Sequence, residues 1–156
     1  PFRGEYFKLK PEKEYLVKHF KVNVPTFSEK DESELCSRAV LVYTGVNRKS
    51  SDISIGLLSS IQNKSKQIFR MMELAEQCEK ILESSGDFDS IGQMLDESWH
   101  LKKQSNPMAT SSLLDSWYER GVNAGALGGK VLGAGGGGFM MFWVKKSLPK
   151  RIFTLQ

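Results

Sequence analysis

A glycine-rich segment is the part of this sequence whose residue types are best suited to chemistry. Residues 125–138 hold eight of the 14 glycines, and six bulky apolar residues, Phe139–Val144, follow at once. Consecutive backbone N–H groups in a glycine loop form a concave nest that attracts anions, phosphate above all. Glycine also costs conformational entropy on folding, so at least one residue of Gly135–Gly138 should have a positive φ or face a ligand closely. We interpret the segment as a phosphate-facing loop followed by a buried strand.

Two common phosphate loops do not fit this segment. A Walker loop needs a glycine where Ala124 stands and a serine or threonine where Val131 stands, although Gly129 and Lys130 match. The dinucleotide fingerprint has its glycines after a strand and at the start of a helix, whereas these glycines precede a strand. A flexible linker or a sharp hairpin is the alternative, and the apolar run that follows argues against a linker.

A second candidate for phosphate binding follows the continuous apolar run Ala39–Tyr43, which we predict to be a buried strand. Arg48 lies in the loop after it, and Ser50, Ser51 and Asp52 can cap a helix. A guanidinium beside hydroxyl groups and a helix N-terminus can clamp a phosphate. The alternative is that Arg48 is solvated and that Ser51 only caps the helix.

The remaining elements follow from periodicity and from turn residues. Residues 7–9 and 15–24 are expected to be extended, and the polar residues 25–37 are expected to form a loop or linker. Helical spacing predicts one long helix or two helices in line over 53–82, ended by Gly86. A second helix, capped by Asp89, carries Trp99 and Lys102.

The last third of the chain completes an α+β arrangement. We predict a third helix over about 111–123, a strand over 128–132, a loop over 133–138 and a return strand over 139–144. Strands followed by helices and then by a hairpin favour an α+β fold, in which helices pack on one face of an antiparallel sheet.

Size and composition limit the function classes. A chain of 156 residues that is 40% hydrophobic can form one domain with a core. A net charge of +4 is too small and too dispersed to argue for nucleic acid. Cys36 and Cys78 form neither a disulfide framework nor a zinc pattern, so we expect no metal site and a reducing cytoplasm. We see no signal peptide and no membrane span, and so expect no membrane partner.

Three segments together resemble a known family. The string GALGGKVLGAGGGGF, residues 125–139, resembles the C-terminal glycine motif of the GHMP kinases, a superfamily that includes galactokinase, homoserine kinase, mevalonate kinase and phosphomevalonate kinase. Val42–Ser51 and Glu97–Lys103 fit one subgroup, the bacterial sugar kinases that phosphorylate D-glycero-D-manno-heptose 7-phosphate. The resemblance covers the chain from about Gly4 onward.

The resemblance implies a domain organisation and a reaction. Residues 38–156 would be the ferredoxin-like C-terminal domain, lacking its final strand, and residues 1–37 would belong to or lead from a missing N-terminal domain. That domain would hold the catalytic residues, so this chain alone should be inactive. The whole enzyme would use ATP and Mg²⁺ to phosphorylate a sugar or sugar phosphate.

The resemblance also suggests which residues contact the ligands. The expected phosphate- or substrate-binding residues are Arg48, Ser50, Ser51, Gly133, Ala134, Gly135, Gly136, Gly137 and Gly138. Trp99 and Lys102 are candidates for facing the substrate, and Lys130 is expected to give structural support. Fucose and galactose remain alternative sugars. The alternative of another class is a non-catalytic α+β domain whose glycine hairpin serves binding or homo-oligomerisation.

Overall fold

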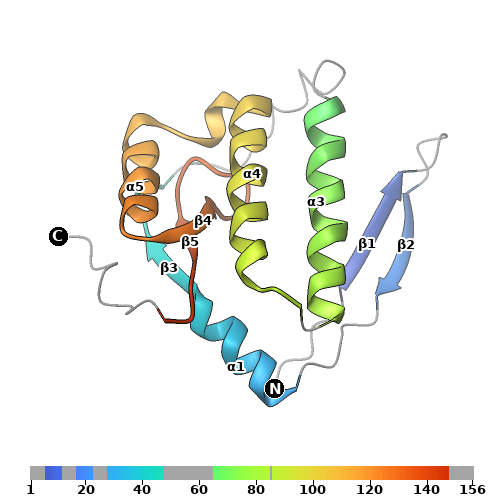
Figure 1. Cartoon of the computed structure of the whole chain (residues 1–156). Coiled ribbons are helices and arrows are strands. Elements are labelled where there is room, and N and C mark those ends of the chain that lie inside the picture. The colour runs from blue at the N-terminus through green and yellow to red at the C-terminus, as the bar shows by residue number, and fades with distance from the viewer. Residues whose placement is uncertain (1–5, 12–16, 23–27, 48–64, 85, 148–156) are drawn as a thin grey trace.

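A computed structural model describes residues 6–11, 17–22, 28–47, 65–84 and 86–147 of the chain. In chain order the elements are β1 Tyr6–Pro11, β2 Val17–Val22, α1 Glu29–Arg38, β3 Ala39–Tyr43, α3 Ser65–Glu83, α4 Asp89–Ser105, the 3₁₀-helix η2 Pro107–Ala109, α5 Ser112–Asn123, β4 Ala126–Val131 and β5 Phe139–Val144 (Figure 1).

The sheet that carries the glycine loop has three antiparallel strands in the order β3-β5-β4. The apolar run predicted as a return strand is its central strand, in which Phe142 lies opposite Val40 of β3 and Gly129 of β4. Met140, Phe142 and Val144 lie in one core cluster and Trp143 lies in another, so both faces of this strand are covered, which explains why its sequence is a continuous apolar run. The predicted α+β fold with an antiparallel sheet is confirmed.

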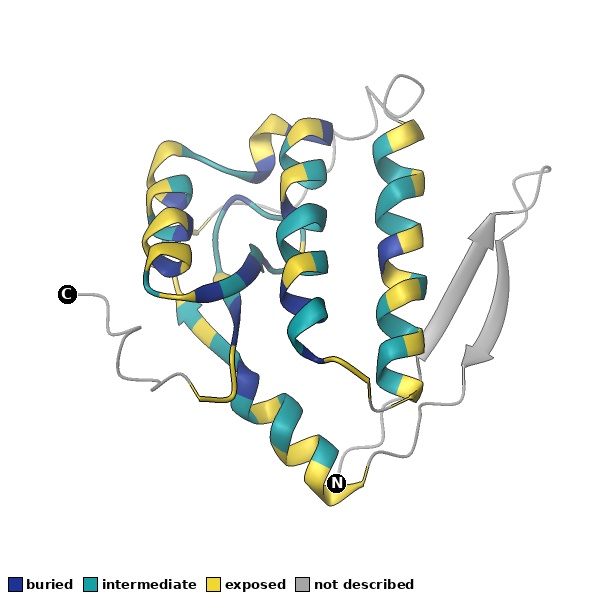
Figure 2. Ribbon diagram, in the orientation of Figure 1, coloured by how far each residue is buried: buried dark blue, intermediate teal, exposed yellow. Residues whose placement is uncertain are grey.

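The core lies between this sheet and helices α4 and α5, whose buried surfaces turn toward the strands (Figure 2). The side chains of Trp99, Leu114, Val131 and Met140 have no exposed surface. Tyr118 packs with Phe142, their ring centroids 6.0 Å apart. Burial of this apolar surface is the main favourable term in folding, so the core fixes the sheet edge from which the loop projects.

Two glycines allow α4 to approach β4 closely. A Cβ on Gly128 would lie 2.8 Å from the Cβ and 3.0 Å from the backbone nitrogen of Asp96, and nearer still to the carbonyl oxygen of Gly92. A Cβ on Gly92 would in turn overlap the side chain of Leu127. The first glycines of the motif therefore permit packing of a helix against a strand.

The segment predicted as a polar loop contains a helix instead. Helix α1 begins after Ser28, whose hydroxyl accepts a hydrogen bond from the backbone N–H of Asp31 at 3.1 Å, and Glu29, Asp31 and Glu32 favour its N-terminus electrostatically. It continues directly into β3, so the predicted boundary at residue 37 falls inside α1. The loop prediction for residues 29–37 was wrong, because it relied on their polar composition and did not use Ser28 as a helix cap.

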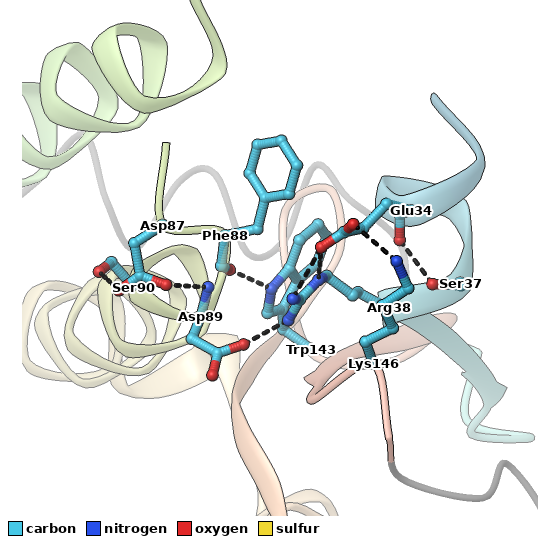
Figure 3. A network of polar contacts seen from close by, with 9 residues as sticks. All are labelled: Glu34, Ser37, Arg38, Asp87, Phe88, Asp89, Ser90, Trp143 and Lys146. Carbon is cyan, nitrogen blue, oxygen red and sulfur yellow. Dashed lines mark hydrogen bonds and ion pairs between the residues drawn. The ribbon is translucent and has the colours of Figure 1, made fainter. Parts of the chain in front are cut away.

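A polar network joins α1, the start of α4 and the end of β5 (Figure 3). Arg38, of which only 8% is exposed, binds Glu34 through its guanidinium at 2.9 Å and also binds the carboxylate of Asp89. Lys146 binds Glu34 at 2.9 Å from the far end of β5. Because one buried cation contacts carboxylates from two helices, the network fixes the N-terminus of α4 relative to α1.

The same view corrects the cap of α4 (Figure 3). Asp87, not Asp89, accepts the hydrogen bonds at this end, from the backbone N–H of Asp89 at 3.0 Å and from the hydroxyl of Ser90 at 2.7 Å. The pKa of Asp87 is lowered, first by the bond from Ser90. Trp143 adds a further tie, since its indole N–H donates to the carbonyl of Phe88 at 2.7 Å.

Strands β1 and β2 and helix α3 agree with the predictions from the sequence over the residues that the structure describes. Strands β1 and β2 form an antiparallel hairpin with Leu9 opposite His19, in a sheet separate from the three-stranded one. Helix α3 lies along α4 (Figure 1), and it ends near Gly86, whose N–H donates to the carbonyl of Ile81 at 3.0 Å. The first part of the predicted helix, residues 53–64, lies outside the described residues.

Candidate phosphate site at the glycine loop

The glycine loop connects β4 to β5 and has a left-handed backbone at several positions. The φ angles are 64° at Gly133, 103° at Gly135, 73° at Gly136 and 78° at Gly138. L-residues with a Cβ rarely adopt these angles. The expectation of at least one positive φ in this run is confirmed.

The second half of the loop is held by carbonyl groups of this chain. The N–H of Gly136 donates to the carbonyl of Ala109 in η2 at 2.6 Å, and the N–H of Gly138 donates to the carbonyl of Val46 at 2.9 Å. A backbone N–H that already donates to a carbonyl does not face an anion. The predicted nest over 133–138 is therefore corrected, because the amides of Gly136 and Gly138 serve the fold.

Two further glycines are required because other parts of the chain lie close to them. A Cβ on Gly135 would lie 2.8 Å from the carbonyl oxygen of Ala109. A Cβ on Gly137 would lie 2.9 Å from the carbonyl carbon of Val46. The close approach anticipated from the sequence is real, but it is an approach of the protein's own backbone.

Thr44 fastens the loop to the segment that follows β3. Its N–H and its hydroxyl both donate to the carbonyl of Gly138 at 2.8 Å, and its hydroxyl accepts from the N–H of Val46 at 3.3 Å. Thr44 is buried, with 3% of its surface exposed. Thr44 was not among the predicted site residues, because Thr-Gly after a strand indicates only that the strand ends.

The first half of the loop is more open. Among the described residues, no acceptor is bound by the N–H groups of Gly133, Ala134, Gly135 or Gly137. Gly133 is exposed, and a Cβ built there would meet nothing within 4 Å. Within the predicted nest, Gly133–Gly135 is thus the continuous run whose N–H groups remain available to an anion.

Lys102, predicted to face the substrate, is brought to this open half. From the last turn of α4 its Nζ donates to the carbonyl of Gly133 at 2.6 Å. Burial, and secondly the charge of Lys130, lower the pKa of Lys102 to about 8. Burial also lowers the pKa of Lys130, which projects from β4. The partly buried ammonium group of Lys102 therefore lies at the loop, with that of Lys130 near it.

Trp99, the other described residue predicted to face the substrate, is not brought to the loop. Trp99 is fully buried in the core, packed beside Tyr118 at a centroid distance of 6.3 Å, so its assignment to a substrate-facing surface is corrected. Its position on the apolar stripe of α4 explains the burial. Arg48, Ser50 and Ser51 lie outside the described residues.

A cavity of about 580 Å³ lies elsewhere, between α4 and α5. Its polar groups bind one another: Lys103 pairs with Asp115 at 3.0 Å, and the Tyr118 hydroxyl donates to Asp96. Burial, followed by the bond to Asp96, raises the pKa of Tyr118. These pairings fit a structural role, because each charged group named here already has a protein partner.

The described ranges show neither a metal-binding cluster nor a membrane-spanning helix. There, no group of three or more His, Cys, Asp or Glu side chains is arranged to hold a metal ion. Among the helices that the structure describes, none has the length and apolar character needed to cross a membrane.

Comparison with known proteins supplies the context for this loop. The model of the family described as GHMP kinases C terminal matches residues 71–154, more than half of the chain. A D-glycero-alpha-D-manno-heptose 7-phosphate kinase of Campylobacter jejuni is 32% identical over 114 residues, which cover 72% of this chain and 33% of that protein. A bifunctional fucokinase/GDP-fucose pyrophosphorylase of Arabidopsis thaliana is 27% identical over 117 residues, or 72% of this chain and 11% of that protein.

Solved structures show the same fold. Mevalonate kinase of L. major in complex with R-mevalonate aligns with a TM-score of 0.65 at 19% identity, over 93% of this chain and 42% of that one. A D-glycero-D-manno-heptose 1-phosphate kinase from Bacteriodes thetaiotaomicron gives 0.58 at 21% identity, over 94% and 36%. A putative sugar kinase from Campylobacter jejuni gives 0.53 at 25% identity, over 92% and 39%.

Proposed function

This chain belongs to the GHMP kinase family, through the C-terminal domain of that family, and from this premise we propose that it is part of a sugar kinase acting on a heptose phosphate. The observation that carries the proposal is the 32% identity to a heptose 7-phosphate kinase over 114 residues. The chain spans about a third of that relative's length. The activity is therefore proposed for the whole protein, and this chain alone should not catalyse the reaction.

The contacts of the glycine loop support a phosphate-positioning role. Phosphoryl transfer depends mainly on placing the reacting groups and neutralising their charge. Gly133–Gly135 offers free backbone N–H groups, and Lys102 adds a cation bonded to the first carbonyl of the loop. The bonds from Gly136 and Gly138 to Ala109 and Val46 hold the loop in place, so that little reorganisation is needed when the anion binds.

The loop also connects to the second candidate site. Thr44 binds Gly138, and the chain runs from Thr44 through Val46 toward Arg48. We propose that Arg48, Ser50 and Ser51 contact phosphate from this side. ATP would supply the transferred phosphoryl group, and we assign no described residue to its Mg²⁺, because the described ranges hold no suitable ligand cluster.

The test compares two proteins made from the same gene. Its full-length product and the 156-residue chain are each assayed for ADP release with ATP, Mg²⁺ and one of three acceptors: heptose 7-phosphate, fucose or galactose. We expect turnover of the heptose phosphate by the full-length product and none by the chain alone. Turnover by the chain alone would contradict the proposal that this half lacks catalytic parts. A folded full-length product that phosphorylates no sugar would instead favour the non-catalytic alternative.

A second candidate function is fucose phosphorylation. The observation in its favour is the 27% identity to a bifunctional fucokinase over 117 residues. The same assay separates the two candidates, since preference for fucose over the heptose phosphate in kcat/KM would replace the leading proposal. The substrate is set by pocket contacts that this chain shares with the rest of the protein.

A further inference from the structure

Two lysines beside the glycine loop are arranged in a way that the fold alone does not require. Lys102 reaches the loop from α4 and donates to the Gly133 carbonyl at 2.6 Å, while Lys130 stands on β4, the strand that leads into the loop. The two ammonium groups are near enough for the charge of one to affect the other. Like charges in a partly desolvated place repel each other, which costs folding free energy.

Several other cations of the described residues are paired with carboxylates. Lys103 binds Asp115 at 3.0 Å, Lys146 binds Glu34 at 2.9 Å, and Arg38 binds Glu34 and Asp89. Over the ranges that the structure describes, Lys102 and Lys130 have no such carboxylate. Two adjacent cations that lack an internal anion are a candidate site for an external one.

The local geometry limits what that anion can be. The carbonyl that Lys102 holds begins the open half of the loop, where the N–H groups of Gly133, Ala134 and Gly135 are free among the described residues. Two positive charges and a set of backbone donors match a phosphate monoester, which carries about −1.5 to −2 charges near neutral pH. A carboxylate has one charge and two oxygens, and so matches less well.

We propose that Lys102 and Lys130, together with the N–H groups of Gly133–Gly135, form a subsite for a phosphate monoester, which in the proposed kinase is the phosphate already present on the sugar. This inference rests on the proposed function for the identity of the ligand, but the subsite itself does not. The terminal phosphate of a nucleotide has the same chemistry and is the other source that the experiment must separate.

Binding of a phosphate monoester at this subsite should be accompanied by the uptake of protons. The pKa of Lys102 is about 8, so about half of the Lys102 side chains are neutral at pH 8. A bound dianion stabilises the ammonium form and raises the pKa of Lys102, and the complex then takes up about half a proton at pH 8. At pH 6.5 Lys102 is already charged, and that uptake should vanish.

Among the described neighbours of Lys102, Lys130 is the other group that can take up such a proton. Lys130 is the charged group that faces it from β4, and its own pKa is lowered by burial. The loop contributes backbone groups only. No titratable side chain is present in β5 (Phe139–Val144) or in η2 (Pro107–Ala109). On α4 itself, Lys103 binds Asp115 instead, and His100 contacts the carbonyl of Asp96 at 2.9 Å.

The experiment is isothermal titration calorimetry on the full-length product, at pH 6.5 and pH 8, in two buffers of different ionisation enthalpy. The titrants are heptose 7-phosphate, the same heptose without phosphate, and ATP with Mg²⁺. We expect proton uptake of about half a proton at pH 8 with the sugar phosphate, and none with the plain heptose. Uptake with ATP alone would overturn the assignment to the sugar phosphate.

Variants test whether the lysines are responsible. Lys102→Met should weaken sugar-phosphate binding at least tenfold and reduce the uptake, whereas Lys102→Arg should keep much of the binding and also reduce the uptake, because arginine does not release its proton. Lys130→Met should weaken binding as well. Lys145→Met, at an exposed lysine beyond β5, is the matched control and should bind as the wild type does.

The outcomes separate this subsite from the proposed function. If folded Lys102→Met and Lys130→Met proteins bind the sugar phosphate as tightly as the wild type, the subsite is refuted while the kinase can still turn over. If no sugar is phosphorylated but binding shows lysine-dependent proton uptake, the proposed function fails and the phosphate subsite stands. Thermal melting of each variant confirms that the protein compared is folded.

Discussion

The sharpest prediction concerns two glycines of one motif that are glycine for different reasons. Gly128 packs against α4, where a Cβ would lie 2.8 Å from the Cβ of Asp96 and overlap the carbonyl of Gly92. Its φ is not among the positive ones. Gly133 has the opposite character, with a φ of 64° and nothing within 4 Å of a built Cβ. A substitution at Gly128 should therefore act by steric overlap, and one at Gly133 by backbone strain.

The expected magnitudes follow from these two causes. A Cβ on Gly128 would overlap the carbonyl oxygen of Gly92, whereas non-bonded heavy atoms normally approach no closer than ~3.5 Å, so Gly128→Ala must push α4 and β4 apart by about an ångström or more. Overpacking of this kind costs about 1–3 kcal/mol or more, and we expect ~2 kcal/mol, a fall in melting temperature of roughly 5 °C. Gly133→Ala should cost about 1 kcal/mol, because a non-glycine residue in the left-handed region costs ~1–2 kcal/mol.

An asparagine series separates the mechanisms even where the alanine values overlap. Asparagine tolerates the left-handed region better than alanine, so Gly133→Asn should be more stable than Gly133→Ala. At Gly128 the larger side chain meets the same helix, so Gly128→Asn should be less stable than Gly128→Ala. The assay is urea unfolding followed by circular dichroism on all four variants. If both positions rank alanine and asparagine in the same order, the distinction drawn from the structure is refuted.

Two more predictions test the contacts that hold the loop and the helices. Thr44→Val should lower the free energy of unfolding by about 1–3 kcal/mol, because it removes a buried hydroxyl that binds the Gly138 carbonyl. Thr44→Ser keeps the hydroxyl and should retain most of that free energy in a urea titration. Equal losses in both variants would contradict this explanation. The bonds from Lys146 and Arg38 lower the pKa of Glu34 from its ordinary value of 4.5, so their stabilisation is complete above that pH and is lost as the pH falls. Glu34→Gln should therefore flatten the decline of melting temperature between about pH 5 and pH 3, and a wild-type slope in this variant would remove Glu34 from the account.

The parts of the fold that could be predicted are those whose signal is local. The run Phe139–Val144 is apolar throughout because side chains on both faces of this strand are buried, and the helix that contains Trp99 shows a clear apolar stripe. Helix α1 was not predicted, because it is short and largely exposed. Its polar sequence lacks an apolar periodicity strong enough to favour a helix over a loop. Its stability comes from Ser28 and from Arg38, whose partner Asp89 lies 51 positions away.

From the sequence, the candidate site could be assigned to the glycine loop, but the contacts within the loop could not be predicted. The glycine run indicates positive φ, and the structure agrees. It does not indicate that Gly136 and Gly138 give their N–H groups to Ala109 and Val46, because those acceptors come from distant parts of the chain. Trp99 shows the same limit: position on a helix stripe cannot tell a core side chain from one that lines a substrate pocket.

The glycine motif therefore combines three physical requirements that look identical in sequence. Gly128 removes a Cβ where a helix meets a strand, and Gly135 and Gly137 remove one where the loop meets backbone of its own chain. Gly133 alone of these four lies in open space, next to the carbonyl that Lys102 binds. Among the described residues, the open end is the part of the loop that combines free N–H groups with nearby cations. The proposed phosphate-binding site therefore comprises the first residues of the run and the two lysines rather than the whole run.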